Sequence, residues 1–388
     1  MREFDAIVIG GGPAGSTAAR FLSRGGKKVA VIDRATFPRV KLCAGWLSAP
    51  VWDALGLSPD DYPRGLWKWR RCHVAFGGEQ FTVRANGYFI RRYELDDYLL
   101  SQSGAELITG HHIKEVIRRD GRWIIDGEVA APVVIGAGGT HCPVARLFPK
   151  KPEPPVGVKE HEFATDYESV AATRVGDDGE PELLLHDDLA GYSWNVPKTE
   201  WLNIGTGTAN ARQVTAAWAL ARDHFTQTGH VPGDAKAALD RMKGHSYYLF
   251  DPAHLDGCHK DGAYLVGDSL GLAHPLTAEG IFPAILSGRL CAEAICAGRP
   301  EAYRQRLESH PTLRDYRLIF EARTLFAGRR QRGEADPEPA RPVRMPRLGK
   351  RAVAGAFAWM FSGRPLPGGH VLRLAAASAR TARAAWSR

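Results

Sequence analysis

Glycines at a fixed spacing near the N-terminus are the residues whose types point most clearly to chemistry. The segment Gly10-Gly11-Gly12-Pro13-Ala14-Gly15 fits G-x-G-x-x-G, between an apolar run at 4–9 and a helical pattern at 16–24. In this pattern Gly10 allows a tight turn, Gly12 lets the backbone approach a pyrophosphate, and Gly15 lets helix and strand pack closely. The first helical turn then offers N–H groups and a partial positive charge to phosphates. The segment predicts a dinucleotide site.

A carboxylate at the end of the next predicted strand, 28–33, extends this site. Asp33 follows Gly15 by 18 residues and can accept hydrogen bonds from the hydroxyls of an adenosine ribose. We include the neighbouring Arg34 among the predicted cofactor contacts. A glycine-rich turn without a ligand and a solvated Asp33 are the alternative interpretations. The motif alone does not choose between NAD and FAD.

The elements that must position these residues predict an α/β protein. The strand–helix–strand opening predicts a parallel sheet, which strands near 133–136 and 263–266 would join. Residues 156–207 alternate apolar and polar types, which is typical of antiparallel strands with one covered face. We predict helices near 210–228 and 233–243, and one or two helices within 349–386.

These patterns divide the chain into three parts. Residues 1–65, 90–150 and 255–300 form a discontinuous, doubly wound, Rossmann-like nucleotide-binding domain. Residues 66–89 and 151–254 form an inserted antiparallel β-sheet domain for the substrate, and 301–388 form a helical, basic C-terminal region.

Composition narrows the class of protein. The chain has 388 residues, of which 44% are apolar and 24% charged, as in ordinary globular proteins of two or three domains. Its longest apolar run covers 352–361, short of the roughly 20 residues of a spanning helix. We see no secretory signal, no Cys-x-x-Cys pair and no zinc spacing, so we expect a cytoplasmic protein without a metal site.

The net charge of +8 is uneven. Residues 339–388 carry ten Lys and Arg and no acid, which leaves −2 for the rest of the chain. A near-neutral body argues against nucleic-acid binding. A basic, Ala-rich tail can contact an anionic membrane surface, and a helix pair docked on the body is the alternative.

Three later segments carry a resemblance to a known family. Residues 90–99, IRRYELDDYL, match V-x-R-x-x-F-D-x-x-L; residues 265–271, LVGDSLG, match G-D-A-A-G; and 274–281, HPLTAEGI, match P-L-T-G-x-G-I. The set resembles FAD-dependent oxidoreductases of the para-hydroxybenzoate hydroxylase type. Residues 37–48 resemble K-x-C-G-G-x-L-S, and 191–198 resemble Y-x-W-x-F-P-K, of the geranylgeranyl reductase family within that type.

The resemblance implies FAD as cofactor and a set of contacts for it. It places Arg92 near the flavin or its phosphates, Asp268 with Gly267 at the ribityl chain, and a helix start beneath the isoalloxazine ring. The further implied contacts are Lys41, Cys43, Ala44, Gly138, Pro275, Glu279, Gly280 and Ile281. Gly138 stands where the hydroxylases have an Asp that touches NADPH, so the electron donor stays open between NADPH and a separate reductase or protein donor.

The family implies reduction of a C=C bond, by hydride from flavin N5, in a small apolar substrate of prenyl or polyketide-like type. Candidate catalytic residues are Cys43, as a proton donor or access-limiting thiol, and Tyr192 and Trp194, which with Trp46 would line an aromatic pocket. Packing roles for all of them are the alternative. The reductase family has a Pro three residues before the Tyr of this motif and a Phe before its final Pro-Lys. In this chain these two positions are Leu189 and Val196.

Other reactions remain open from the sequence. An aromatic hydroxylase is the second hypothesis. A flavin halogenase is the third, because 191–197 also resembles G-W-x-W-x-I-P, and Lys41 or Lys198 would supply the lysine that halogenases need. An electron-transfer flavoprotein that docks a protein donor and a membrane quinone is the fourth.

Overall fold

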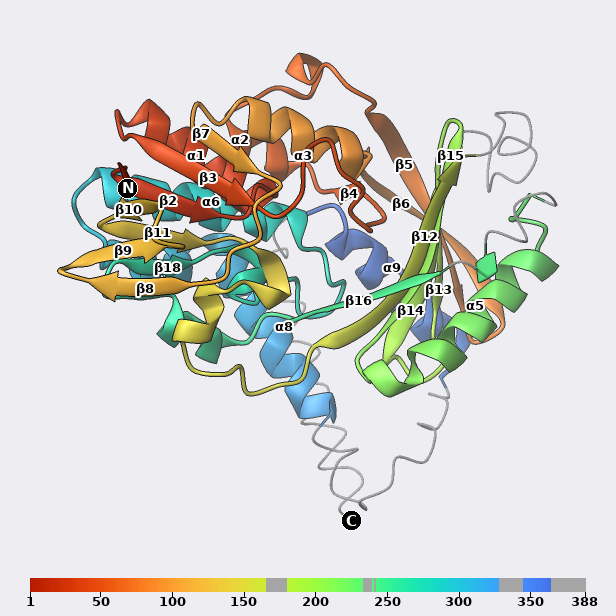
Figure 1. Cartoon of the computed structure of the whole chain (residues 1–388). Helices are drawn as coiled ribbons and strands as arrows, with labels where there is room; N and C mark the ends of the chain where they lie inside the picture. Colours follow the sequence, from red (N-terminus) through yellow and green to blue (C-terminus); the bar gives the residue numbers. More distant parts are fainter. Residues whose placement is uncertain (165–179, 233–238, 241, 328–344, 364–388) are drawn as a thin grey trace, which may run out of the picture.

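The computed structural model describes residues 1–164, 180–232, 239–240, 242–327 and 345–363 (Figure 1). Within them the chain forms three β-sheets and the helices that cover them. In Figure 1 the two smaller sheets lie on the left, and the largest sheet stands on the right.

The central sheet is parallel except at one edge. Its order is β17-β18-β11-β2-β3-β7, with β17 (His259–Lys260) antiparallel to β18. The other strands are β18 (Ala263–Leu265), β11 (Val133–Gly136), β2 (Ala6–Ile9), β3 (Val29–Asp33) and β7 (Glu106–Thr109). All four residues of β2 are buried, as expected for a parallel strand covered on both faces. The predicted doubly wound α/β architecture is confirmed.

Two helices pack closely over this sheet. They are α1 (Pro13–Arg24) and α6 (Ile281–Cys296), and a Cβ atom on Gly288 of α6 would lie 2.3 Å from the Ala14 carbonyl oxygen of α1. Gly288 therefore permits the close approach of the two helices. A four-stranded sheet adds Trp123 and Ile125 to the same core; its order is β1 (Arg2–Glu3), β10 (Val129–Ala131), β9 (Arg122–Ile125), β8 (Val116–Arg119).

The largest sheet has eight strands, drawn from distant parts of the chain. Its order is β16 (Lys243–Tyr247), β12 (Val156–Ala164), β15 (Trp201–Thr208), β14 (Gly191–Lys198), β13 (Glu182–Leu185), β5 (Trp67–Phe76), β6 (Glu79–Phe89), β4 (Trp46–Leu47). Only the β13–β5 pair is parallel. The division of the chain into two domains remains a proposal, although β5 and β6 join β12–β16 here as it expects.

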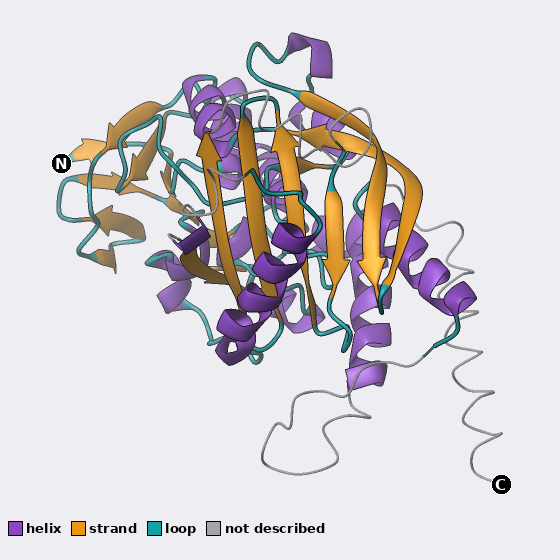
Figure 2. Cartoon of the chain, turned by 90° about the vertical axis from the view of Figure 1, so that its right-hand side faces the viewer, coloured by secondary structure: helices purple, strands orange, loops and turns teal. Residues whose placement is uncertain are grey.

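Helices cover both faces of the large sheet. α5 (Val214–Gln227) lies over β12, β14 and β15 on the outer face, as Figure 2 shows, and corresponds to the helix predicted near 210–228. On the inner face α9 (Arg347–Met360) packs against β5 and β6. Most of the second predicted helix, 233–243, lies outside the described residues.

The remaining helices join these layers. They are α2 (Pro50–Leu55), α3 (Arg92–Ser101), α7 (Ala302–Ser309) and α8 (Pro311–Ala327), with 3-10 turns at Pro59–Asp61, Gly139–His141, Val144–Leu147, Ala211–Gln213, Pro252–Gly257 and Gly267–Ser269. No helix in the described ranges has the length and apolar character needed to cross a bilayer.

The first part of the basic C-terminal region is docked on the body. Arg347 and Lys350 of α9 both pair with Glu79 of β6, at 2.9 and 3.3 Å, and Lys350 also donates to the Gly77 carbonyl. The alternative of a docked helix therefore holds for α9. The Arg-bearing segment 371–386 lies outside the described residues, so membrane contact through it stays a prediction.

Candidate active site

The turn between β2 and α1 depends on two glycines that have no room for a side chain. Gly10 has φ +112°, and a Cβ there would lie 2.4 Å from the Ala137 carbonyl oxygen. A Cβ on Gly15 would lie 1.9 Å from the carbonyl oxygen of Gly10. Gly12 is different, because the nearest atom to its added Cβ is Arg39 Nη2 at 3.6 Å. Packing fixes Gly10 and Gly15, whereas Gly12 leaves space in front of the helix.

The start of α1 is suited to an anion. Gly12 is the N-cap residue and gives no side-chain cap, and Pro13 occupies the first turn. The uncapped N–H groups of that turn carry the positive end of the helix dipole. Asp33 braces the turn, since its carboxylate accepts from Gly11 N at 2.7 Å and from Ala35 N at 2.8 Å. Arg34 beside it is exposed.

Asp268 lies after β18 among positive charges. Its carboxylate makes no hydrogen bond to a residue in the described ranges, and its Oδ1 would be 3.3 Å from a Cβ on Gly280. Burial raises the pKa of Asp268, and the charges of Lys41, Arg92 and Lys151 oppose that rise. Lys41 is exposed, and desolvation by the surrounding protein, together with the charge of Arg92, lowers the pKa of its amine. Three cationic side chains therefore surround a carboxylate that has no hydrogen-bond partner among the described residues.

Arg92 is held by a buried carboxylate one helical turn away. Its Nε and Nη2 donate to the two oxygens of Asp96 at 2.6 and 2.7 Å, and Arg39 also contacts Asp96 at 3.0 Å. The Asp96 pair raises the pKa of Arg92 despite burial, so the guanidinium stays charged. Two cations on one carboxylate leave net positive charge beside the Cys43 loop.

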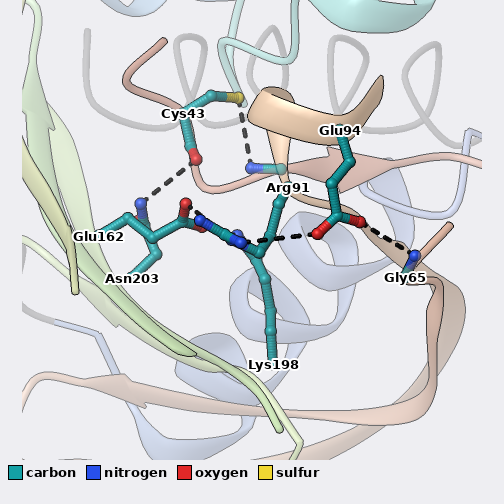
Figure 3. Close-up of polar contacts among 8 residues, drawn as sticks. Cys43, Gly65, Arg91, Glu94, Glu162, Lys198 and Asn203 are labelled. Atoms are coloured by element: carbon teal, nitrogen blue, oxygen red, sulfur yellow. Dashed lines mark hydrogen bonds and ion pairs between the residues drawn. The ribbon is translucent and has the colours of Figure 1, made fainter. Parts of the chain in front are cut away.

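The loop before β4 brings Cys43 to this charge. Its Sγ accepts the Gly45 N–H at 3.3 Å, and its carbonyl oxygen accepts the Asn203 side-chain amide at 3.2 Å (Figure 3). Burial raises the pKa of the Cys43 thiol, against the opposing charge of Arg92. Cys43 is therefore a thiol, not a thiolate, at neutral pH.

The inner face of the large sheet places a buried acid opposite this loop. Glu160 of β12 is 1% exposed and lies within reach of Asn203, while its Oε2 is buried and has no hydrogen-bond partner among the described residues. His245 Nε2 is 3.6 Å from Oε1. Burial raises the pKa of Glu160 to about 7 and lowers that of His245 to about 4. The pair is a protonatable acid beside a neutral imidazole.

Asn203 connects three parts of this face. Its Oδ1 accepts the Trp194 indole N–H at 2.7 Å, and its amide nitrogen serves Cys43 as described. The Trp194 ring lies over Gly205, where a Cβ would come within 2.3 Å of it. Residues paired across antiparallel strands point to the same face, so Gly205 opposite Glu160 leaves room for the ring.

Lys198 is committed to an ion pair. Its side chain is fully buried, and Nζ lies 2.7 Å from Glu162 Oε1. Arg91 contacts the other oxygen of Glu162 at 3.3 Å, and Arg91 and Glu94 continue the network to Gly65 (Figure 3). Of the two lysines that a halogenase could use, Lys198 is therefore held in an ion pair.

Two of the three rings expected around an aromatic pocket, Tyr192 and Trp46, pack against the C-terminal helix region. Phe357 lies 5.0 Å from Tyr192 between ring centroids, and Phe361 lies 4.2 Å from Trp46. These contacts are of the packing kind, and a substrate pocket lined by Tyr192, Trp194 and Trp46 stays a prediction. The Tyr192 hydroxyl donates to the Thr277 carbonyl at 2.5 Å.

The segment before α6 carries the other predicted cofactor contacts. α6 begins at Ile281 with Gly280 as N-cap, and Gly267 (φ +58°) packs against Ala14 and Ala284. Glu279 does not extend into the first turn of α6, since its Oε1 accepts Ser48 Oγ at 2.7 Å. The remaining predicted contacts are Pro275, buried; Ala44, half-buried; and Gly138, exposed at the end of β11.

Comparisons with known proteins agree with this geometry. A family model described as an FAD binding domain matches residues 3–48. Digeranylgeranylglycerophospholipid reductase 1 of Methanopyrus kandleri is 28% identical over 75% of this chain and 80% of its own length. A geranylgeranyl bacteriochlorophyll reductase-like protein from Thermoplasma acidophilum has TM-score 0.64 and 20% identity over 83% of this chain and 87% of its own.

This chain is an FAD-dependent oxidoreductase related to the geranylgeranyl reductases. The fold is shared more widely. The myxobacterial chondrochloren halogenase superposes with TM-score 0.66 and 20% identity, over 94% of this chain and 91% of its own. The prediction of an FAD-dependent enzyme is confirmed, and the fold alone does not choose its reaction.

The residues of the flavoenzyme fit FAD. The space in front of Gly12 and the uncapped start of α1 suit a pyrophosphate, and the unused carboxylate of Asp268 suits ribityl hydroxyls. Asp33, Arg92 and the start of α6 lie on the elements expected of them. That each of these residues contacts FAD stays a prediction.

Sequence reasoning missed the polar side chains of the sheet in this oxidoreductase. Glu160, Asn203, Glu162 and His245 belong to no motif and come from three strands. One signal was available. Val158, Glu160 and Glu162 stand at every second position of β12 and so lie on one face of the strand, where Val158 is buried. A carboxylate on the covered face of a strand needs a partner or a function.

Proposed function

We propose that the enzyme reduces a C=C bond of an apolar, prenyl-type substrate. Two of its relatives are named as reductases of geranylgeranyl compounds, and these names support this substrate class. The observation that carries the proposal is the buried Glu160 carboxyl opposite the Cys43 loop. The reduction adds a hydride to one carbon of the double bond and a proton to the other, so a site for this reaction needs a protonated acid.

The side chains of the site would divide the work between them. FAD, when bound and reduced, supplies the hydride. Glu160, with its pKa raised to about 7, carries a proton in a large share of the molecules at neutral pH, and Asn203 orients both this carboxyl and the Cys43 loop. The Cys43 thiol is a second group that carries a proton. Trp194 would give the site a rigid apolar wall, with Tyr192 behind it braced by Phe357 of α9.

The same contacts weaken the halogenase alternative. That reaction needs a lysine amine free between cofactor and substrate. Lys198 is fully buried and paired with Glu162, so it is not a free amine. Lys41 is different, because its charge acts both on Asp268 and on Glu160 and His245 of the sheet face, and it is the one of the two lysines that a halogenase could still use.

Product analysis tests the proposed reaction. The FAD-loaded enzyme, reduced anaerobically with dithionite, is mixed with geranylgeranyl diphosphate or a digeranylgeranyl glycerolipid, and the lipid is analysed by mass spectrometry. We expect a gain of H2 for each reduced double bond, without oxygen. No reduced lipid from either substrate, together with a hydroxylated aromatic in air or a halogenated product with added halide, would overturn the proposal.

Two substitutions test the site assignment. We expect Cys43→Ala and Trp194→Ala to lower single-turnover reduction at least tenfold while FAD remains bound, since both lie on the site and not on α1. Leu220→Ala, on the exposed face of α5, is the matched control. Unchanged turnover in both variants would remove Cys43 and Trp194 from the site.

A further inference from the structure

A cavity lies behind the segment 274–280. It encloses about 470 Å³ between α2, α6, α8 and the end of α9. Its middle is apolar, formed by Phe282 and Leu286 of α6 and Ile319 of α8, all at least nine-tenths buried. A volume of this size is in the range of small-molecule sites.

The inner end of the cavity is polar because Glu279 lines it. Its Oε1 accepts Ser48 Oγ at 2.7 Å and Ser48 N at 3.3 Å. Its Oε2 makes no hydrogen bond to a residue in the described ranges, and the carboxyl is 7% exposed. Burial raises the pKa of Glu279 to about 7, so the group carries a proton for much of the time at neutral pH.

His274 stands beside Glu279 on the same wall. Its Nδ1 accepts two backbone N–H groups, from Leu276 at 3.1 Å and Thr277 at 2.9 Å. The ring proton is therefore on Nε2, because a neutral imidazole has one donor and one acceptor. Burial lowers the pKa of His274 to about 3, which keeps the ring neutral. The inner end thus has two groups able to donate a hydrogen bond, and the hydroxyl of the buried Tyr316, whose ring lies 4.7 Å from that of His274, is a third in the cavity lining.

The segment 274–280 separates this cavity from the sheet face. Leu276 packs in the cluster that contains Trp194, and the Thr277 carbonyl accepts the Tyr192 hydroxyl. His274 and Glu279 line the cavity on the opposite side. The segment 274–280 and the end of α9 therefore lie between the cavity and the sheet face.

We propose that this cavity binds an apolar molecule that carries one carbonyl oxygen, which accepts a hydrogen bond from the Glu279 carboxyl at the inner end. The apolar walls would take up the hydrocarbon part, and the donors at the inner end select an acceptor oxygen. The inference goes beyond the proposed reduction and does not rest on it, since binding is measured without turnover.

Binding of a matched pair of probes tests the inference. The oxidised, FAD-loaded full chain is titrated with 2-acetylnaphthalene and with 2-ethylnaphthalene, which lacks the oxygen, by equilibrium dialysis. We expect one site, with the ketone bound about fivefold more tightly, as a hydrogen bond near 1 kcal/mol implies. Equal affinity for the two probes, or no saturable binding of the ketone, would overturn the proposal.

Cavity-filling variants locate the site. Leu286→Trp and Ile319→Trp enter the cavity from opposite walls, and each is expected to weaken ketone binding at least tenfold. Leu220→Trp, on an exposed face of α5, is the control of equal size and is expected to bind as the wild type does. Unchanged binding in both cavity variants, with loss in Trp194→Ala, would assign the ketone to the sheet face and overturn the proposal.

Two substitutions of Glu279 give a reading that does not depend on tolerance of a larger side chain. Glu279→Gln keeps a donor and is expected to retain the preference for the ketone at all pH values, whereas Glu279→Ala is expected to lose it. In the wild type that preference falls as the pH rises above 7, because the carboxylate no longer donates. A preference that survives in Glu279→Ala contradicts the role of Glu279.

Discussion

The two sides of the candidate active site control charge by opposite means. The turn at 10–15 uses backbone alone: two glycines set its shape, a third leaves space, and helix N–H groups supply the positive charge. The sheet face uses side chains, with Glu160 as a buried acid and the half-buried Glu162 as the counter-ion of the buried Lys198. A phosphate needs a fixed field, whereas a reaction needs a proton that can leave. The first demand suits backbone, and the second suits a titratable group.

The largest effect is expected on the backbone side. Gly15→Ala places a Cβ 1.9 Å from a carbonyl oxygen, so α1 must shift, at a cost of about 3 kcal/mol or more. We expect the purified variant to lose FAD and to unfold at lower urea concentration. Gly355→Ala is the control, because no atom lies within 4 Å of its added Cβ, and its effect should be at most about 1 kcal/mol and stabilising. Full flavin content and an unchanged urea midpoint in Gly15→Ala would contradict this packing argument.

Gly12→Ala sharpens the contrast within the same turn. Its Cβ meets nothing closer than 3.6 Å, so the fold should be retained. The methyl group enters the space assigned to the pyrophosphate, and we expect FAD affinity to fall at least tenfold at unchanged stability. Equilibrium dialysis of FAD against the apoprotein measures this. Wild-type affinity would mean that the pyrophosphate lies elsewhere.

Next in size is the buried ion pair of the sheet face, where the two partners are not equivalent. Glu162→Gln leaves the fully buried Lys198 without a carboxylate, and removal of one partner of a buried pair costs about 3–5 kcal/mol. Lys198→Met leaves Glu162 still paired with Arg91, so we expect a smaller loss. Urea unfolding of the two variants measures the difference. Equal losses would show that Arg91 does not compensate.

A smaller effect is expected at Asn203. Asn203→Ala leaves the Trp194 indole N–H without its partner, at a cost of about 1–3 kcal/mol. Asn203→Asp keeps the acceptor for the indole and should recover part of that stability. The urea midpoints of the two variants decide. If Asn203→Asp is no more stable than Asn203→Ala, the indole bond carries little of the energy.

The parts of the fold and site that could be predicted from the sequence are those made by neighbours in the chain. The turn at 10–15 and the strand pattern of 156–207 are set by local geometry, so spacing predicted them, whereas the start of α6 was implied by the family resemblance. The Glu160–Asn203–Cys43 group joins three segments that touch only after the sheet forms. The position of α9 over Tyr192 likewise depends on packing between distant apolar faces, which no spacing along the chain reveals.

The sheet face also predicts a pH dependence of stability. Glu160 has a pKa raised from 4.5 to about 7 in the folded chain, so its stabilising contribution is complete below pH 4.5 and is lost as the pH rises to 7. Glu160→Gln should flatten this part of the curve of unfolding free energy against pH. Glu279→Gln should flatten it in the same range for the same reason. Parallel curves for the wild type and Glu160→Gln would show that Glu160 has the same pKa in the folded and the unfolded chain.

The pH profile of reduction is the most direct test of the account, which holds that the sheet face supplies the proton. The reduced, FAD-loaded enzyme is mixed anaerobically with a geranylgeranyl lipid in single turnovers from pH 5 to 9, alongside Glu160→Gln. We expect the wild-type rate to fall above about pH 7 with one ionisation, and the variant to be slow and to lack that step. A variant as fast as the wild type, with the same profile, would contradict the assignment of the proton to Glu160.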